Sequence, residues 1–363
     1  MESVDLSQIK IYYLHYNEEE YNEKYYNYIF EYFNYLNSME YMFNNCTRLK
    51  SLNFDFKMSD LFGTCMNVIS QKFMFNNCIS LTYMPISSLC FYCAECPSYE
   101  LNNIFYNCFS LKSVIFNENY PFVGHNTTMS YMFYNCTSLV SLSLFFEYTD
   151  IPYDMSYAFT NCSSLKNIEL DFFSSDGTQG KTMSNAFRDC TVLVSIHINF
   201  VLDYEDMSYA FMDCHFLQDL DIYYFNALNV KYMNHLFYNC WSLSSIDFLP
   251  SPFIAYGLID ISYMFRRSYL TKVNFTIPMS DKINNYQGLF YDCYDLEIID
   301  VSSFTHNNLP DTNLSIFNPD ETDYCFDKNV TIFINEEFLK RIETPNCSNI
   351  VIKNKTYFNN ESI

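Results

Sequence analysis

Three closely spaced cysteines form the one local cluster in this sequence that could bind a metal. Cys90, Cys93 and Cys96 are separated by two residues each, a spacing found in iron–sulfur sites. The place of the fourth ligand in such a run is taken by Glu100, and Pro97 follows the third cysteine directly. A zinc site would need a fourth ligand from elsewhere in the chain. We therefore expect these cysteines to pack in a loop, and we expect no metal and no cofactor.

Residue combinations that perform acid–base or nucleophilic catalysis are not found. The six histidines are scattered, and neither His-Glu-x-x-His nor Gly-x-Ser-x-Gly occurs. Only 6 of the 363 residues are glycine, and no phosphate-binding glycine motif is present. The sequence thus predicts no catalytic residues and no enzyme activity.

The charge balance argues against nucleic acids and membranes as partners. The chain has 42 acidic and 20 basic residues, a formal charge of −22, so no basic stripe is available for phosphate groups. No apolar stretch approaches the roughly 20 residues that cross a bilayer. The first residues also lack the basic and apolar segments of a signal peptide. We expect no nucleic-acid binding, no membrane insertion and a cytosolic chain as written.

Nine further cysteines share one sequence context, which reveals an internal repeat. Each follows a phenylalanine by three residues and precedes a leucine by three, as in Met132-Phe-Tyr-Asn-Cys-Thr-Ser-Leu139. A tenth copy has serine in the cysteine position. The ten positions are Cys46, Cys78, Cys108, Cys136, Cys162, Cys190, Cys214, Cys240, Ser268 and Cys293. They span 247 residues in nine steps, a mean period near 27.

The repeated cysteines are better suited to packing than to cross-linking. One identical position in each copy does not pair off into disulfides, and Ser268 shows that a small, weakly polar side chain suffices there. We expect buried, reduced thiols, which are typical of a reducing compartment. The residue before each is Asn or Asp in nine of the ten copies. Both tolerate the left-handed backbone of a turn, so we expect a turn there.

Each copy changes its hydrophobic period halfway along. In the fourth copy the apolar residues from Met129 to Cys136 are spaced i, i+3, i+4, i+7, which predicts a short helix. Those from Leu139 to Leu144 end in alternation, which predicts a short strand. The fold class we expect is therefore an α/β solenoid of about ten short helix–turn–strand coils. Stacking of the coils would bury a continuous core.

The segments that flank the repeats differ from them, as capping segments should. Asn17 can cap a helix whose apolar face runs from Tyr26 to Leu36. Near the other end, residues 330–334 predict a strand, 336–342 a short helix and 350–352 another strand. We expect a helical N-terminal cap over residues 1–38, a solenoid over 39–303 and a C-terminal cap over 304–363.

The block from 129 to 144, MSYMFYNCTSLVSLSL, resembles the BspA-like leucine-rich repeats, also called the bacterial surface protein 26-residue repeat. The similarity covers about residues 39–303, although the return loops vary in length and the chain is unusually aromatic. The resemblance implies a non-enzymatic surface protein that takes part in adhesion to, or interaction with, host or neighbouring cells. It also implies a strand–helix–strand C-terminal segment.

In each copy the residues between the strand's apolar positions should point away from the core. In the later copies these residues are mostly acidic, and together with neighbouring outward positions they suggest a dock for a basic or polar protein partner, or simply a solvated face. The residues of this predicted surface are Glu169, Asp171, His197, Asp219, Asp221, Tyr223, Asp247 and Asp300. The alternative function is an intracellular structural or scaffold component of a larger assembly. The sequence fixes neither the localisation nor the oligomeric state, and the 34 tyrosines have no explanation in the repeat.

Overall fold

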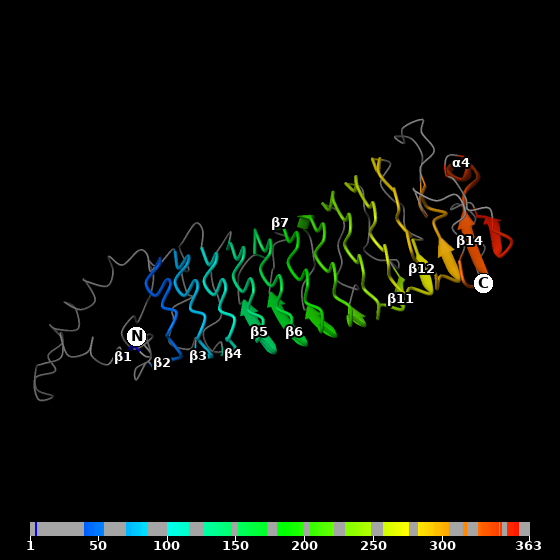
Figure 1. Cartoon of the computed structure of the whole chain (residues 1–363). Helices are drawn as coiled ribbons and strands as arrows, with labels where there is room; N and C mark the ends of the chain where they lie inside the picture. The colour runs from blue at the N-terminus through cyan, green and yellow to red at the C-terminus, as the bar shows by residue number, and fades with distance from the viewer. Residues whose placement is uncertain are drawn as a thin grey trace, which may run out of the picture. The chain divides into compact units, whose positions relative to one another are not determined.

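The structure is a computed structural model, shown in Figure 1. It describes residues 4–5, 40–53, 70–85, 100–115, 127–146, 152–172, 180–198, 204–220, 229–247, 257–275, 282–304, 315–317, 326–340, 342 and 347–355. The chain divides into two compact units, Met1–Thr178 and Gln179–Ile363. Each unit contains five of the ten repeat copies.

In the first unit each of the five coils contributes one short strand, β1 precedes the first coil, and the paired strands are parallel. The strands are β1 (Val4–Asp5), β2 (Leu52–Asn53), β3 (Tyr83–Pro85), β4 (Ser113–Ile115), β5 (Ser141–Phe146) and β6 (Asn167–Phe172). The described pairs are β1 with β2, β3 with β4 and β5 with β6. The register places Leu142 beside Ile168, so equivalent leucine-type residues of successive coils lie next to each other in the core.

The second unit continues the same pattern. Its elements are β7 (Gly180–Thr182), β8 (Ser195–Ile198), β9 (Tyr204–Asp206), β10 (Asp219–Leu220), β11 (Ser245–Asp247), β12 (Lys272–Asn274), β13 (Ile298–Asp300), β14 (Val330–Ile334), α4 (Glu336–Leu339) and β15 (Ile350–Asn354). Strands β11 to β15 form a parallel five-stranded sheet in chain order, β8 pairs with β10, and β7 pairs with β9 in a separate ladder. The expected solenoid of stacked coils is therefore present within each unit (Figure 1).

The prediction of a short helix in each coil is wrong, because two consecutive turns occupy this segment. In the fourth copy the Cys136 amide donates to the Phe133 carbonyl at 3.0 Å, and an equivalent bond closes the turn before it. The third residue of each turn has a left-handed φ, 56° at Tyr131 and 61° at Asn135. A right-handed helix needs a negative φ at every residue, so these two residues prevent it.

The backbone amides of the turn segment alternate between two kinds of partner. The amides of Tyr131, Phe133 and Asn135 donate to carbonyls of the next coil at 2.7 to 3.0 Å, while the amides of Tyr134 and Cys136 close turns within their own coil. The same alternation recurs in the second unit. Half of the amides in this segment thus depend on a neighbouring coil, which explains why a coil needs its neighbours to fold.

Stacked phenylalanines form the centre of the core. In the first unit Phe43, Phe75, Phe105, Phe133 and Phe159 lie ring over ring, with centroids 5.2 to 5.5 Å apart. The second unit repeats this with Phe187, Phe211, Phe237, Phe265 and Phe290 at 5.5 to 5.9 Å. All ten side chains are buried. The core expected from the repeated Met/Ala-Phe-x-Asn-Cys block is confirmed.

The C-terminal segment has the expected order of strand, helix and strand. Strand β14 covers the expected residues, α4 is shorter than expected, and β15 is longer by two residues. The Asn335 side chain caps α4 by accepting from the Phe338 amide at 2.8 Å, and it also donates to the carbonyls of Ser302 and Phe304.

Within the described ranges, no helix is long and apolar enough to cross a membrane.

The structure does not test the predicted N-terminal helical cap. Residues 6–39, which include the expected helix from Asn17, lie outside the described residues. Residues 305–314, where the C-terminal cap was expected to begin, lie outside them as well. The boundaries at residues 38 and 303 therefore stay a prediction.

Candidate functional site

The strands present one buried and one exposed row of side chains, as the alternation predicts. In β6, Ile168 and Leu170 are buried and Glu169 between them is exposed. In β8, Ile196 is buried and His197 is exposed. We call the exposed row of each unit its strand face. Two residues of the predicted binding surface, Glu169 and His197, thus lie on the strand faces, and their binding role stays a prediction.

The remaining residues of the predicted surface fall into two groups. Asp171, Asp219 and Asp247 belong to β6, β10 and β11, but their side chains lie outside the described part of the structure. Asp221 and Tyr223 lie outside the described residues altogether.

Asp300 does not lie on the open strand face, contrary to expectation. Its side chain is only 8% exposed. The carboxylate accepts from the amide and the hydroxyl of Ser302 at 3.1 and 2.6 Å, and it pairs with Lys355 at 2.7 Å. Because Lys355 directly follows β15, this ion pair joins the last coil to the C-terminal strand. No sequence pattern indicated this pair, because the two residues are 55 positions apart.

Eight of the nine repeat cysteines are buried, and Cys46 in the first coil is partly exposed. The thiols of Cys78, Cys108, Cys136, Cys162, Cys214, Cys240 and Cys293 each donate to the phenylalanine carbonyl of the preceding coil at 2.8 to 3.2 Å. The Ser268 hydroxyl makes the same bond at 2.8 Å. Burial raises the pKa of Cys78 and of Cys293 to about 12. These thiols are free and protonated at neutral pH, which confirms the expected packing role.

The other cysteines add one contrast. Cys347 is disulfide-bonded, unlike the nine repeat cysteines. Cys90, Cys93 and Cys96 lie outside the described residues, so their role as loop-packing residues stays a prediction. In the part of the chain that is described, no group of three His, Cys, Asp or Glu side chains is placed to hold a metal ion.

The asparagines before the cysteines form a ladder in the first unit. Each Nδ2 donates to the Oδ1 of the preceding coil's asparagine at 2.8 to 3.0 Å, through Asn45, Asn77, Asn107, Asn135 and Asn161. All five have a left-handed φ. The turn expected at this position is confirmed, and the amide side chains add a second role that the sequence pattern alone did not show.

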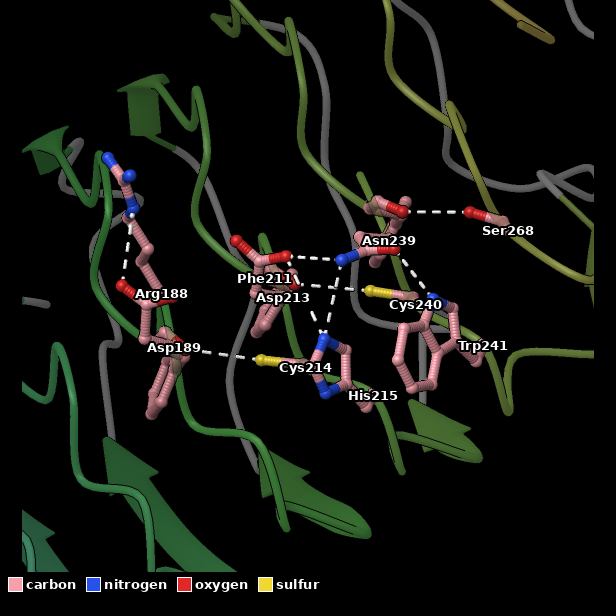
Figure 2. A network of polar contacts seen from close by, with 12 residues as sticks. Arg188, Asp189, Phe211, Asp213, Cys214, His215, Asn239, Cys240, Trp241 and Ser268 are labelled. Carbon is pink, nitrogen blue, oxygen red and sulfur yellow. Dashed lines mark hydrogen bonds and ion pairs between the residues drawn. The ribbon is translucent and has the colours of Figure 1, made fainter. Parts of the chain in front are cut away.

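In the second unit aspartates interrupt this ladder. Asp213 accepts from the Asn239 amide at 2.6 Å, but a carboxylate offers no hydrogen to Asp189 in the coil before. Burial raises the pKa of Asp189, and the neighbouring Asp213 raises it further, while Arg188 at 3.5 Å opposes both. Two carboxylates therefore lie near each other, and Arg188 pairs with one of them, Asp189 (Figure 2).

A histidine and a tryptophan stack beside the interrupted ladder. The rings of His215 and Trp241 are 3.9 Å apart and nearly parallel, at 5°. The indole N–H donates to the Oδ1 of Asn239 at 2.6 Å, and His215 Nε2 lies 3.8 Å from Asp213 (Figure 2). Sequence reasoning missed this cluster. Its signal was that the residue after the repeat cysteine becomes aromatic in four successive copies.

Tyrosines stack between coils and account for part of the tyrosine surplus. Tyr131 lies on Tyr157 at 4.7 Å, although both have a left-handed φ that is unusual for a bulky residue. In the second unit His235 lies between Tyr209 and Tyr263, at 4.5 and 5.1 Å. Burial there lowers the pKa of His235 to about 4, so this histidine is neutral at physiological pH.

Comparison with known proteins agrees with the repeat. The family described as "BspA type Leucine rich repeat region" matches residues 21–153, 71–175, 126–257, 156–297 and 234–326, which together cover most of the chain. No curated protein matches it.

Three solved structures show limited similarity. A leucine-rich repeat protein from Bacteroides ovatus is 16% identical, with 72% of this chain and 81% of that chain covered and a TM-score of 0.24. A leucine rich cell surface protein from Faecalibacterium prausnitzii is 20% identical, with 86% and 75% covered and a TM-score of 0.28. TLR13 in a complex with ssRNA13 is 14% identical, with 85% and 47% covered and a TM-score of 0.30. The repeat block, the stacked coils and the family match together show that the chain belongs to the BspA-type leucine-rich repeat family.

Proposed function

We propose that this protein is a non-enzymatic, surface-exposed binding protein that uses its strand face to hold a basic or polar protein partner. The observation that carries the proposal is the alternation in β6 and β8, where buried residues fix the strands and Glu169 and His197 project outward. Leucine-rich repeats generally offer such a face to partners.

The strand face is organised before any partner arrives. In β5 and β6 the parallel register sets Ser143 opposite Glu169, and the Ser143 hydroxyl donates to the carboxylate at 3.1 Å. A side chain held in this way loses little freedom on binding, so a long face of shallow contacts can still give useful affinity. We propose that Asp171, Asp219, Asp221, Tyr223 and Asp247 complete the surface.

Two observations support a surface location over the intracellular scaffold. Disulfides such as that at Cys347 persist mainly in oxidising surroundings, outside the cytosol. The chain also belongs to the BspA-type leucine-rich repeat family, and its repeat block resembles that of bacterial surface proteins. The buried repeat thiols do not oppose this location, because burial and their raised pKa keep them unreactive in either compartment.

Labelling of intact cells tests the location. An antibody against the protein should stain unpermeabilised cells, and added protease should remove the signal. Staining only after permeabilisation, together with co-purification in a large native assembly, would instead support the scaffold. Proximity labelling on the same cells would identify the partner.

Charge reversal tests the strand face once a partner is found. Glu169→Lys places a positive charge at an exposed position of β6 and should lower the affinity for a basic partner several-fold. Lys166→Glu is a suitable control because it changes charge at an exposed residue just before the same strand, outside the row between the leucines. Equal affinity of the Glu169 variant and the unmodified protein would refute docking at this place.

A further inference from the structure

A row of exposed lysines crosses the first unit. In each of its five coils the residue directly after the buried leucine is exposed, and in the first, third and fifth coils this residue is a lysine. We call Lys50, Lys112 and Lys166 the lysine row. Thr82 and Val140 occupy the same position in the coils between them. The net charge of −22 does not reveal this local group of positive charges.

Backbone hydrogen bonds between the coils fix the spacing of the lysine row. The amide of Thr82 donates to the carbonyl of Lys50 at 3.0 Å, and the amide of Lys112 donates to the carbonyl of Thr82 at 2.9 Å. The same bonds continue through Val140 to Lys166, at 3.3 and 2.9 Å. Hydrogen-bonded strands lie about 4.8 Å apart, so successive lysines of the row project from backbone positions about 10 Å apart.

The surface around the lysine row contains no carboxylate in the described part of the first unit. It comprises five positions of each coil: the ladder asparagine, the two residues after the repeat cysteine and the two residues after the buried leucine. In the five coils these positions hold four basic residues, the lysine row and Arg48, and no Asp or Glu. Among the described residues, Lys112 and Lys166 form no ion pair, so their charges are available to a ligand.

Stacking of the coils does not require a surface without carboxylates. In the second unit the same five positions include Asp189, Asp213, Asp292, Asp295 and Glu297, and the coils stack there as well. The contrast between the units therefore comes from their exposed residues and not from the repeat. In an acidic chain, a surface that has only positive charges indicates a ligand with negative charges.

Hydroxyl groups and aromatic rings lie on the same surface as the lysines. Tyr83 and Phe109 are 39% and 41% exposed. The residue directly before the buried leucine is a serine in four of the five coils: Ser80, Ser110, Ser138 and Ser164. Sugars combine hydroxyl groups with apolar C–H faces, so they bind surfaces that offer polar side chains beside aromatic rings. The composition of this surface therefore favours a carbohydrate ligand.

We propose that the lysine row binds an extended acidic polysaccharide. A linear polysaccharide of disaccharide repeats, with one acidic sugar in each, presents its negative groups at a regular interval, as the lysine row presents its positive ones. Carboxylate or sulfate groups of the polysaccharide pair with the lysines, and the sugars between them contact Thr82 and Val140. A lysine is a point charge on a flexible stem, so it can pair with either group.

The spacing of the lysine row fits a nucleic acid less well. Each strand of a nucleic acid carries a charge about every 3.4 Å, much closer together than the lysines. The lysine row also shares no residue with the strand face, so this proposal does not depend on the proposed function.

Titration of the full chain with labelled oligosaccharides tests the binding, with fluorescence anisotropy as the readout. Hyaluronan oligosaccharides carry one carboxylate in each disaccharide repeat, and the same oligosaccharides with their carboxylates reduced to alcohols are the matched control. We expect the acidic form to bind in a saturable way that weakens with added salt, and the reduced form not to bind. Oligosaccharides of five repeats should bind about tenfold more tightly than a single repeat, because they reach several lysines at once.

Chondroitin with and without its sulfate groups distinguishes the two kinds of negative group. Both forms carry one carboxylate in each repeat, so they differ only in the sulfate. Saturable binding of either form supports the proposal, and the form that binds more tightly identifies the group that the lysines prefer.

Variants of the lysine row assign the site. Lys112→Ala and Lys166→Ala should each weaken hyaluronan binding about threefold, and the double variant about tenfold, since exposed ion pairs contribute modestly. Both side chains are exposed, so the variants should fold, which thermal unfolding checks. Lys353→Ala is the matched control, because it removes an exposed lysine of the second unit. It should bind hyaluronan as the unmodified protein does.

Several results would overturn the proposal. They are unchanged affinity of the double variant, equal binding of the reduced oligosaccharides, and no saturable binding of hyaluronan or chondroitin sulfate. Equal binding of single-stranded DNA or polyglutamate with the same number of charges would also overturn it, because the lysines would then attract any polyanion. Glu169→Lys should leave polysaccharide binding intact, so the strand face and the lysine row can fail separately.

Discussion

At the scale of single residues, Ser268 shows what the cysteine column requires. Its hydroxyl makes the bond to Phe237 that each neighbouring thiol makes to the phenylalanine one coil earlier. The column thus needs a small donor that reaches a carbonyl, and a thiol fits because it also packs as an apolar group. This explains why the sequence could identify the column as structural, while the donor role became visible only with the coils in register.

The donor role predicts the effect of two substitutions at the same site. Ser268→Ala removes one hydrogen bond and should lower the free energy of unfolding by about 1 kcal/mol. Ser268→Cys restores the donor and should stay within about 0.5 kcal/mol of the unmodified protein. Urea denaturation measures both. If the alanine variant is as stable as the cysteine variant, the bond to Phe237 contributes nothing.

Burial of the thiols predicts their chemical reactivity. Cys78 is fully buried with its pKa raised to about 12, whereas Cys46 is partly exposed. At neutral pH an alkylating reagent should label Cys46 first and leave Cys78, Cys136 and Cys293 unmodified until the protein unfolds. Mass spectrometry of timed samples checks this order. Labelling of Cys136 at the rate of an exposed thiol would contradict the buried column.

At the scale of elements, the hydrophobic spacing correctly predicted which residues are buried, but it predicted a helix where the backbone forms two turns. Residues at i, i+3, i+4 and i+7 share one side of a helix, but they also share one side of two consecutive turns. The distinction lay in Tyr131 and Asn135, four residues apart, where the backbone is left-handed. Asparagine accepts this conformation readily, but a tyrosine does so rarely, so residue type alone did not indicate the first turn.

The two left-handed positions predict a graded response at Asn135. Asn135→Gly keeps the backbone freedom but loses both side-chain bonds of the ladder. Asn135→Ala loses the bonds and adds about 1–2 kcal/mol for the left-handed conformation. The order of stability should therefore be asparagine, glycine, alanine in thermal unfolding. A helix in this segment would reverse glycine and alanine, because alanine is the better helix former.

The interrupted ladder predicts a pH effect. The pKa of Asp189 is raised in the folded protein above its usual value of 3.8, so folding favours its protonated form, and stability from this group is lost as pH rises through the folded value. Asp213→Asn removes the neighbouring negative charge and supplies a donor. We expect a higher melting temperature at neutral pH, with the gain shrinking as pH falls below about 4. A gain of equal size at both pH values would exclude the carboxylate pair as its cause.

At the scale of the whole molecule, the charge of −22 affects folding and binding in opposite ways. Repulsion among excess carboxylates opposes the compact state, but the same charge attracts a basic partner. The sequence established the excess and the repeat. It did not show which carboxylates are exposed, since Asp300 is buried in an ion pair with Lys355. It also did not reveal the contacts of Trp241, because the residue type at that position varies from coil to coil.

Salt separates these two effects. Raising sodium chloride to about 0.5 M shortens the Debye length to a few Å and screens surface charges. The melting temperature should rise by a few degrees, while affinity for a basic partner of the strand face should fall. Calorimetry and anisotropy over one salt series measure both. A parallel rise or fall of the two quantities would contradict a common electrostatic origin.

The alternating amides of the turn segment have a consequence for how such a chain can change over generations. Within the described residues, coils of both units repeat the same pattern of donors and acceptors, as at Phe133 in one unit and Phe211 in the other. A gene that gains or loses one whole coil therefore leaves no backbone group without a partner inside the array. The number of coils can therefore change during evolution, which changes the length of the exposed strand face. The exposed residues of each coil can change independently of this.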